Sequence, residues 1–278
     1  MGKFKIKPAS FFVNLTLIIF SITCIFPIIW LFYSSVKTTR EFAQSVIGLP
    51  RNPTLEHYIN VFATGRIPGY IINTSRNTVI AVAAIIFFGF VIGYLLARIK
   101  FRGRHFVYVL FVMGMLMPIH AIVVPTYILY LNFGLVNRWF TLLFPYIAFG
   151  LPISVFLAES YIRSLPTELE EAAAIDGSSF LRTMFTIMMP LATPVMITVG
   201  IIQFFATWNE FFFALILLND ESLFTIPVGL SRMRGGQFTA NYPRLMASMI
   251  ISISIPMVLY FIFSKRIIQG MVAGAVKG

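Results

Sequence analysis

The sequence is poor in cysteine and in charged residues, and these two shortages exclude most classes of protein. A single cysteine, Cys24, excludes a disulfide scaffold. Charged residues make up 11% of the 278 residues, against about 25% in an average soluble domain, so a soluble fold would expose large apolar patches. The 30 phenylalanines and 11 tyrosines exclude a disordered chain. A polytopic membrane protein remains.

The motifs of a self-contained ATPase or a metalloenzyme are also missing. No G-x-x-x-x-G-K-[ST] phosphate loop occurs, so any ATP that drives the protein must bind another chain. His57, His105 and His120 are too scattered for a metal site, and no catalytic triad or carboxylate pair presents itself. The sequence therefore predicts a chain that is not an enzyme and carries no metal or cofactor of its own.

Six charge-free stretches are long enough to cross a bilayer, which takes about 20 apolar residues. We expect an all-α membrane protein with six transmembrane helices, the first of them an anchor rather than a cleaved leader. The fifth helix is extended past Glu210 because the apolar run resumes directly after it. The predicted helices lie near 11–34, 77–97, 106–130, 140–161, 191–218 and 244–264.

The net charge of +11 is distributed between the apolar stretches, which favours a membrane over nucleic acid as the partner of the basic residues. Six spans place both termini on one side. That side holds 12 of the 21 basic residues, including four between Arg98 and Arg104, and most of the others lie in two longer loops. Because basic residues concentrate in short cytoplasmic loops, both termini should be cytoplasmic. Trp30 and Trp139 would then lie near the outer interface.

The loop between spans four and five holds four of the ten acidic residues within nine positions. Thr167 and Glu170 are spaced as a capping box, and Gly177 suits a left-handed stop. We expect a short helix over 167–177 and a second that begins after Ser178 or Ser179 and ends at Pro190. This elbow either docks another protein or lies on the membrane, although interfacial helices prefer basic faces.

A resemblance decides between these alternatives. Glu171-Ala172-Ala173, followed by Gly177, Ile187 and Met189-Pro190, resembles the "EAA" loop of ATP-binding-cassette importer permeases, with Met189 where the family pattern has leucine. The resemblance implies that the elbow is a coupling helix docked on an ATPase subunit. The residues it assigns to this coupling are Glu170, Glu171, Ala172, Ala173, Asp176, Gly177, Ile187 and Pro190.

The C-terminal tail, Gln269 to Gly278, resembles the smaller permease subunit of maltose-type carbohydrate importers. In that family the tail reaches the ATPase interface; without the resemblance, a Gly/Ala-rich terminus is often frayed. The tail residues concerned are Gly274, Ala275, Val276, Lys277 and Gly278. The implied parts are a cytoplasmic N-terminus (1–10), a first helix with its outer loop (11–76), a core permease domain (77–264) with the coupling loop 164–190, and a cytoplasmic tail (265–278).

The resemblance implies a set of partners in the inner membrane and on both sides of it. These are a second homologous permease, two cytoplasmic ATPases that hold ATP and magnesium, an extracytoplasmic solute-binding protein and the lipid bilayer. The implied activity is import of a sugar or oligosaccharide. Alternatives are import of another solute such as a glycerol phosphate, and ion-coupled secondary transport through Glu210 and His120.

Two further groups of residues are candidates for sites. Trp208, Asn209 and Glu210 could line a substrate path, or could tie span five to a neighbouring helix, because charges inside spans are costly. Glu159 and Arg163 are spaced as an ordinary helical ion pair. A loop that reaches into the binding protein, or a plain connector, is predicted around Arg234, Gly235, Gly236 and Gln237.

Overall fold

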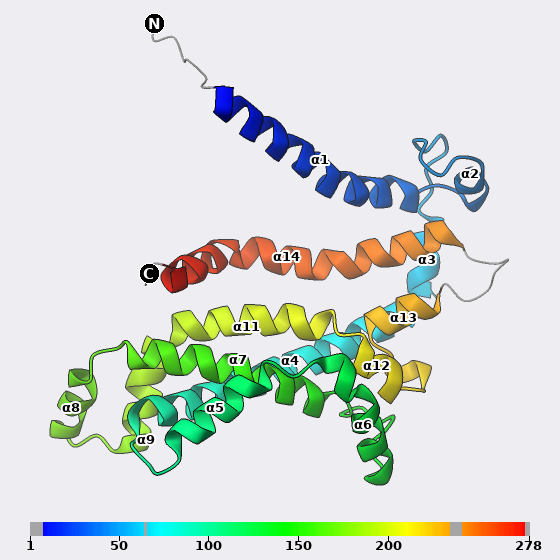
Figure 1. The fold of residues 1–278 in the computed structure, drawn as a ribbon. Helices are drawn as coiled ribbons and strands as arrows, with labels where there is room; N and C mark the ends of the chain where they lie inside the picture. Colours follow the sequence, from blue (N-terminus) through cyan, green and yellow to red (C-terminus); the bar gives the residue numbers. More distant parts are fainter. Residues whose placement is uncertain (1–7, 64–65, 234–240, 276–278) are drawn as a thin grey trace, which may run out of the picture. The chain divides into compact units, whose positions relative to one another are not determined.

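The computed structural model describes residues 8–63, 66–233 and 241–275, with side chains placed only between 12 and 263, and every regular element in these ranges is helical (Figure 1). The longer helices are α1 (Pro8–Ser35), α4 (Arg66–Arg98), α5 (Arg104–Gly114), α6 (Ile119–Asn132), α7 (Leu143–Arg163), α11 (Thr193–Trp208) and α14 (Tyr242–Ala275). The shorter ones are α2 (Thr39–Gln44), α3 (Glu56–Ala63), α8 (Glu168–Ile175), α9 (Phe180–Thr183), the π-helical η1 (Met184–Met188), α10 (Met189–Leu191), α12 (Phe212–Leu217), the 3₁₀ turn η2 (Glu221–Leu223) and α13 (Ile226–Arg232).

The chain forms two compact units. The first combines the residues up to Ile67 with Leu230–Ser254, and the second combines Pro68–Gly229 with the residues from Ile255 onward. The first unit contains α1 and the loop that follows it. The second contains most of the helices, with α7 packed against both α5 and α11.

Four continuous helices in the described residues are long and apolar enough to cross a membrane, namely α1, α4, α7 and α14. Two more pairs qualify only as bent spans: α5 with α6, bent by 101°, and the α9–α10 segment with α11, bent by 71°. The predicted uninterrupted helices 106–130 and 191–218 are therefore wrong, although the apolar segments themselves are confirmed as helical.

Prolines lie at both breaks. Proline lacks a backbone N–H, and Pro118 takes an extended conformation at the start of α6, after a turn in which the N–H groups of Met115 and Leu116 donate to carbonyls only three residues earlier. In the fifth segment, Pro190 and Pro194 flank the break at Ala192. After α11 the chain breaks again before α12, so the predicted extension of span five to 218 is a separate short helix.

Helix α4 begins eleven residues earlier than the charge-free count predicts, at Arg66 rather than 77. Arg76, the charged residue just before the charge-free stretch, lies within the helix, and its guanidinium has polar and aromatic partners. It lies over the ring of Trp139, 5.5 Å from the centroid, and donates to the Trp139 carbonyl at 3.4 Å. Arg76 therefore does not mark the end of the helix, because a long basic side chain can carry its charge away from the apolar part of a span.

Small residues let α4 and α7 approach closely. A Cβ added to Gly89 would lie 1.8 Å from Ser154 Oγ, and one added to Gly93 would lie 2.6 Å from Ala158 Cβ. The Ser154 hydroxyl donates to the Ile85 carbonyl across the same contact at 3.2 Å. Gly89 and Gly93 form the G-x-x-x-G spacing that favours close helix pairs in membranes, so the sequence contains a signal for this contact that hydropathy does not show.

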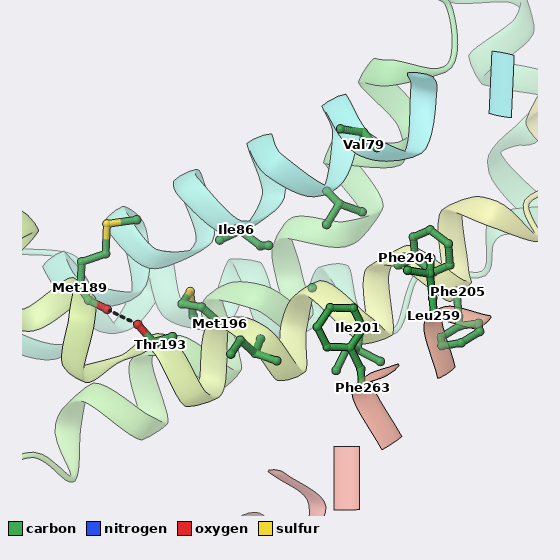
Figure 2. Close-up of a pocket in the computed structure, with 13 residues that line it drawn as sticks. Val79, Ile86, Met189, Thr193, Met196, Ile201, Phe204, Phe205, Leu259 and Phe263 are labelled. Atoms are coloured by element: carbon green, nitrogen blue, oxygen red, sulfur yellow. Dashed lines mark hydrogen bonds between the residues drawn. The ribbon is translucent and has the colours of Figure 1, made fainter. Parts of the chain in front are cut away.

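An apolar groove of about 510 Å³ lies between α4, α11 and the second unit's part of α14 (Figure 2). Figure 2 shows Val79 and Ile86 of α4 facing Met196 and Phe204 of α11. The other lining residues are Val82, Met189, Thr193, Ile197, Gly200, Ile201, Phe205, Leu259 and Phe263. With so few polar groups the groove suits an apolar helix or acyl chain and lacks the hydrogen-bonding groups that a sugar needs.

Candidate functional site

The elbow predicted between spans four and five is present, with α8 as its first limb and α9 with η1 as its second (Figure 1). Gly177 separates the limbs at φ +78°, a conformation that L side chains rarely adopt. The Ser178 N–H donates to the Ala173 carbonyl at 2.9 Å and the Gly177 N–H to the Ala174 carbonyl at 3.0 Å. These two bonds form a Schellman stop, which confirms the predicted role of Gly177.

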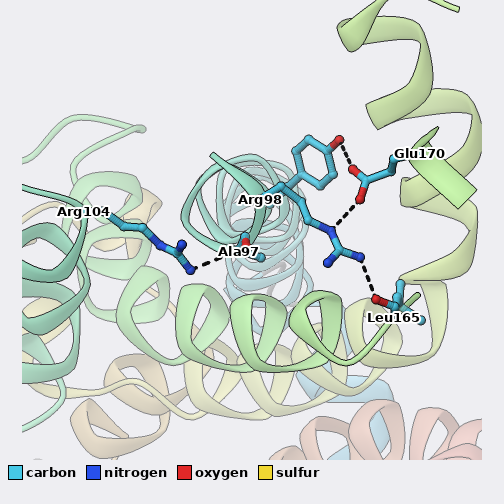
Figure 3. A network of polar contacts seen from close by, with 6 residues as sticks. Ala97, Arg98, Arg104, Leu165 and Glu170 are labelled. Atoms are coloured by element: carbon cyan, nitrogen blue, oxygen red, sulfur yellow. Dashed lines mark hydrogen bonds and ion pairs between the residues drawn. The ribbon is translucent and has the colours of Figure 1, made fainter. Parts of the chain in front are cut away.

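The capping box predicted at Thr167 and Glu170 is wrong. Thr167 lies in a helical conformation and makes no side-chain cap bond. Glu170 instead faces α4, where its carboxylate accepts a hydrogen bond from the Tyr94 hydroxyl at 2.5 Å and pairs with Arg98 Nε at 2.6 Å (Figure 3). Long-range pairing therefore replaces the local cap.

Arg98 bridges both ends of the segment that leads into α8. Its guanidinium also donates to the Leu165 carbonyl at 2.8 Å (Figure 3). The side chains of Arg98 and Glu170 are only 11% and 18% exposed, so the attraction between them is screened less than in a surface pair. The first limb of the elbow is thus bound to the end of α4 by one charged pair and two hydrogen bonds.

The second limb is attached to the same helix by aromatic contacts. Phe180 lies against Tyr94, with ring centroids 5.6 Å apart, and Phe185 stacks on Phe87 at 6.2 Å and contacts Phe90 at 6.4 Å. Phe87, Phe90 and Tyr94 follow one another at helical spacing on α4, so they form one face. Both limbs of the elbow consequently pack on a single membrane helix.

The outer face of the elbow combines acids with uncovered apolar side chains. Glu171, Ala172, Asp176 and Gly177 are exposed, and Ile175 is 87% exposed. Leu169 and Leu181, one on each limb, are exposed as well. Ala173 is buried, Ile187 is half-buried and Pro190 is exposed. The eight residues assigned to coupling thus divide into an outward set, led by Glu171 and Asp176, and an inward set that includes Glu170 and Ala173.

A second ionic cluster lies where α7 meets α5. Glu159 is buried and pairs with Arg163 one turn later, which confirms the predicted ion pair. Arg104 Nη2, at the start of α5, lies 3.8 Å from the same carboxylate. Arg104 also donates to the Ala97 carbonyl at 3.5 Å (Figure 3). Because a buried carboxylate without a cationic partner is costly, this cluster constrains how α7 packs on α5.

Trp208, Asn209 and Glu210 lie at the end of α11, outside the lining of the apolar groove. Glu210 accepts hydrogen bonds from the Phe213 and Ala214 N–H groups of α12, at 2.8 and 3.2 Å, and from the Tyr146 hydroxyl of α7 at 3.2 Å. Trp208 is buried. Of the two interpretations, the tie to a neighbouring helix accounts for all these contacts of Glu210.

The remaining candidates divide between the described and the undescribed residues. The loop Arg234, Gly235, Gly236 and Gln237 lies outside the described residues, as do Val276, Lys277 and Gly278 of the tail. Gly274 and Ala275 belong to the last turn of α14, with no side-chain detail. His120 makes an edge-to-face contact with Phe212 at 4.3 Å. Among the described residues, no group of three or more His, Cys, Asp or Glu side chains could hold a metal ion.

Tyr94 and Arg98 were not among the residues predicted from the sequence. A signal for them exists, since they lie four residues apart and therefore on one face of the helix at the end of a span. The spacing does not predict that their partner is Glu170, which lies 76 residues after Tyr94 in the chain.

Comparison with known proteins places these features in context. Residues 86–273 match the family described as "Binding-protein-dependent transport system inner membrane component". The chain is 34% identical over 265 residues to the trehalose/maltose transport system permease protein MalG of Thermococcus litoralis, covering 94% of each chain. It is 32% identical over 252 residues to the diacetylchitobiose uptake system permease protein NgcG of Streptomyces coelicolor, covering 90% of this chain and 83% of that protein.

A solved structure has the same fold. A chain of a bacterial ABC transporter involved in the import of the acidic polysaccharide alginate superposes with a TM-score of 0.83 at 23% identity. The match covers 95% of this chain and 99% of that one. The helical architecture described above is therefore shared with a chain of an ABC importer.

Proposed function

Since the chain belongs to the family of inner membrane components of binding-protein-dependent transport systems, we propose that it is one permease subunit of an ATP-binding-cassette importer for a sugar or oligosaccharide. The family is the membrane component of such importers and not itself an ATPase. The similarity to permeases named for trehalose/maltose and for diacetylchitobiose supports a carbohydrate as the cargo.

The observation that carries the proposal is the attachment of the elbow to α4. An exposed face of acidic and apolar side chains, Glu171, Ile175 and Asp176 among them, suits docking into a cleft on an ATPase. The inward carboxylate of Glu170 binds Tyr94 and Arg98. A pull on α8 by closing ATPases would thus reach α4 directly, since ion pair, hydrogen bonds and aromatic contacts all end on that helix.

Helix α4 gives the movement a route into the membrane. Tyr94 and Val79 are fifteen residues apart on α4, which is about 22 Å of helix rise. The elbow contacts α4 between Phe87 and Arg98, and α4 lines the apolar groove between Val79 and Ile86. A rigid helix that joins the two transmits a displacement at the elbow to the membrane-spanning part.

The rest of the transporter follows from this role. A second homologous permease, two cytoplasmic ATPases holding ATP and magnesium, and an extracytoplasmic solute-binding protein would complete it. Both termini would be cytoplasmic, with 12 basic residues on that side against nine on the outer one. The tail from Gly274 to Gly278 and the loop Arg234–Gln237 are then the proposed contacts with the ATPases and the binding protein.

Uptake into vesicles tests the proposal. The complete transporter is reconstituted in proteoliposomes, and labelled maltose, trehalose, chitobiose and glycerol phosphate are each supplied with the binding protein. We expect uptake that requires ATP on the side of the membrane where the ATPases are bound. This uptake should continue when an ionophore collapses the proton gradient. Uptake that persists without ATP and stops with the ionophore would establish the secondary-transporter alternative. Uptake of glycerol phosphate but of no sugar would show that the transported solute is a glycerol phosphate.

A further inference from the structure

The loop after α1 folds back along the helix instead of projecting from it. Trp30 Nε1 donates to the Val46 carbonyl at 3.1 Å, and the Tyr33 hydroxyl donates to the Ile47 carbonyl at 2.6 Å. Trp30 lies five residues before the end of α1, which is about 7.5 Å of helix rise. Side chains on a helix also lean toward its N-terminus, so these bonds hold the loop beside the last turns of the helix.

The part of the loop held there is apolar and uncovered. Ile47 is 71% exposed and Leu49 is 75% exposed, and Val46 beside them is exposed as well. We refer to Val46, Ile47 and Leu49 as the apolar tip. Contiguous apolar side chains without cover mark a contact surface, and the depth of this one relative to the membrane is set by α1.

Helix α1 defines that depth. Every residue from Phe12 to Ile29 is exposed within the chain, and the helix is long and apolar enough to cross a bilayer. Tryptophan and tyrosine at the end of a span occupy the headgroup level, because their rings are apolar on one side and carry a hydrogen-bonding group on the other. Because Trp30 and Tyr33 bond directly to the backbone of the tip, the tip lies at the same level.

Lys37 locks the loop in this position. Its side chain is fully buried, and its ammonium group donates to the Ser45 and Val46 carbonyls at 3.0 and 3.2 Å. The same group lies over the rings of Tyr33 and Phe42, 5.3 and 5.8 Å from the centroids. A buried cation with carbonyl and ring partners is costly to displace, so the tip is a fixed feature and not a free loop.

We propose that the apolar tip is an interfacial anchor that inserts Val46, Ile47 and Leu49 into the outer leaflet of the lipid bilayer beside α1. The partner is the lipid surface itself, at the boundary between headgroups and acyl chains. The inference goes beyond the transport function: it requires that α1 spans the membrane, and the choice of the outer leaflet rests on the cytoplasmic N-terminus of the proposed function. A solute-binding protein or the second permease as the occupant are outcomes that the experiment separates.

The single native cysteine allows a site-directed test. In a Cys24→Ser background, Ile47→Cys and Asn52→Cys each receive an environment-sensitive nitrobenzoxadiazole label; Asn52 is an exposed residue of the same loop and serves as the matched control. The complete transporter is reconstituted in phosphatidylethanolamine–phosphatidylglycerol vesicles. Quenching is measured with aqueous iodide and with phosphatidylcholine that carries a nitroxide near the headgroup.

We expect iodide to quench the label at 47 at least about threefold less than at 52, and the lipid nitroxide to show the opposite order, because interfacial apolar faces are buried about 5–10 Å into the boundary. Equal iodide quenching at both positions overturns the proposal. Protection at 47 that arises only when the binding protein is added also overturns it, as does protection without lipid quenching, which indicates the second permease.

Two further arms keep the outcomes distinct. A label on native Cys24 reports whether α1 is in the bilayer: if deep lipid quenchers do not reach it, the failure belongs to the membrane assignment and not to the anchor alone. Adding Lys37→Met to the Ile47→Cys protein removes the donor to the Ser45 and Val46 carbonyls. Iodide quenching at 47 should then rise toward the value at 52, and an unchanged value contradicts the locking role.

Discussion

The hydroxyl of Tyr94 donates a 2.5 Å hydrogen bond to the carboxylate of Glu170, which joins a membrane helix to a short helix 76 residues later. Next to Glu170, Glu171 faces outward and is exposed. Two neighbouring glutamates therefore have opposite surroundings, and the proposed coupling depends on both.

The first prediction separates the two glutamates. Glu170→Ala leaves the largely buried Arg98 without its anion and removes the bond from Tyr94, so it should destabilise the permease by about 1.5–3 kcal/mol. Glu171→Ala changes only an exposed side chain and should leave stability unchanged while weakening ATPase association. Thermal unfolding in detergent and co-purification with the ATPase measure the two effects. Equal losses of stability in both variants would contradict the inward and outward division.

The second prediction concerns the bend at Gly177. An L residue at φ +78° costs about 1–2 kcal/mol, so Gly177→Ala should weaken the elbow and reduce ATP-driven uptake. Gly177→Pro should abolish uptake, because proline requires a φ near −65° and removes the N–H that donates to Ala174.

Gly134 provides the control for that strain. It has a φ of +64° and, like Gly177, open space around its Cβ position. Gly134→Ala should cost similar stability yet retain ATPase association and the stimulation of ATP hydrolysis. If both glycine variants lose association to the same degree, the effect at Gly177 is a general loss of folding and not a failure of the elbow.

The third prediction tests the role of Glu210. Its carboxylate accepts from two N–H groups of the first turn of α12, and Glu210→Ala should cost about 0.5–2 kcal/mol, as for the loss of other helix caps. Glu210→Gln keeps one of the two acceptor oxygens, so it should lose less stability than Glu210→Ala and retain uptake with an unchanged KM. Asn209→Ala should likewise leave the KM unchanged, because the Asn209 amide donates to the Phe205 carbonyl of its own helix at 2.9 Å. A large rise in KM for Glu210→Gln at normal stability would restore the interpretation as a substrate path.

The fourth prediction uses the close contact of α4 with α7. Gly89→Ala places a Cβ 1.8 Å from Ser154 Oγ and should destabilise the protein by about 1–3 kcal/mol, because a packed helix pair must separate. Adding Ser154→Gly makes room and should recover most of the loss, whereas Gly69→Ala, with nothing within 4 Å, should be neutral. Unfolding midpoints of the three variants test this; no recovery in the double variant contradicts the assigned contact.

Hydropathy determined where the membrane segments lie, but not whether they are straight. Prolines occur inside α1, α6, α7 and α14 without breaking these helices, whereas Pro118 lies at a 101° bend. The residue type is the same in each case. The difference is whether neighbouring helices and turns satisfy the backbone groups that proline leaves free, and that depends on the tertiary structure.

The elbow shows the same division at the level of single residues. Glycine at a helix end and the EAA spacing were enough to predict the stop at Gly177 and the family, because a left-handed stop depends on local backbone sterics. The local pattern also predicted a capping box at Thr167, which is absent, since Arg98 and Tyr94 offer Glu170 a stronger, less solvated set of partners.

By itself the sequence determined an all-helical membrane protein, the places of its apolar segments and the position of its elbow. The length of an apolar run, the scarcity of charge and the residues that favour a turn all act over short stretches of chain. They can therefore be recognised in the sequence alone. Only the tertiary structure decided which glutamate faces α4, that Glu210 caps a helix, and that α4 and α7 meet at Gly89 and Ser154. These three contacts depend on which residues, distant in sequence, are brought together away from water. There, hydrogen bonding, ion pairing and packing outweigh local conformational preference.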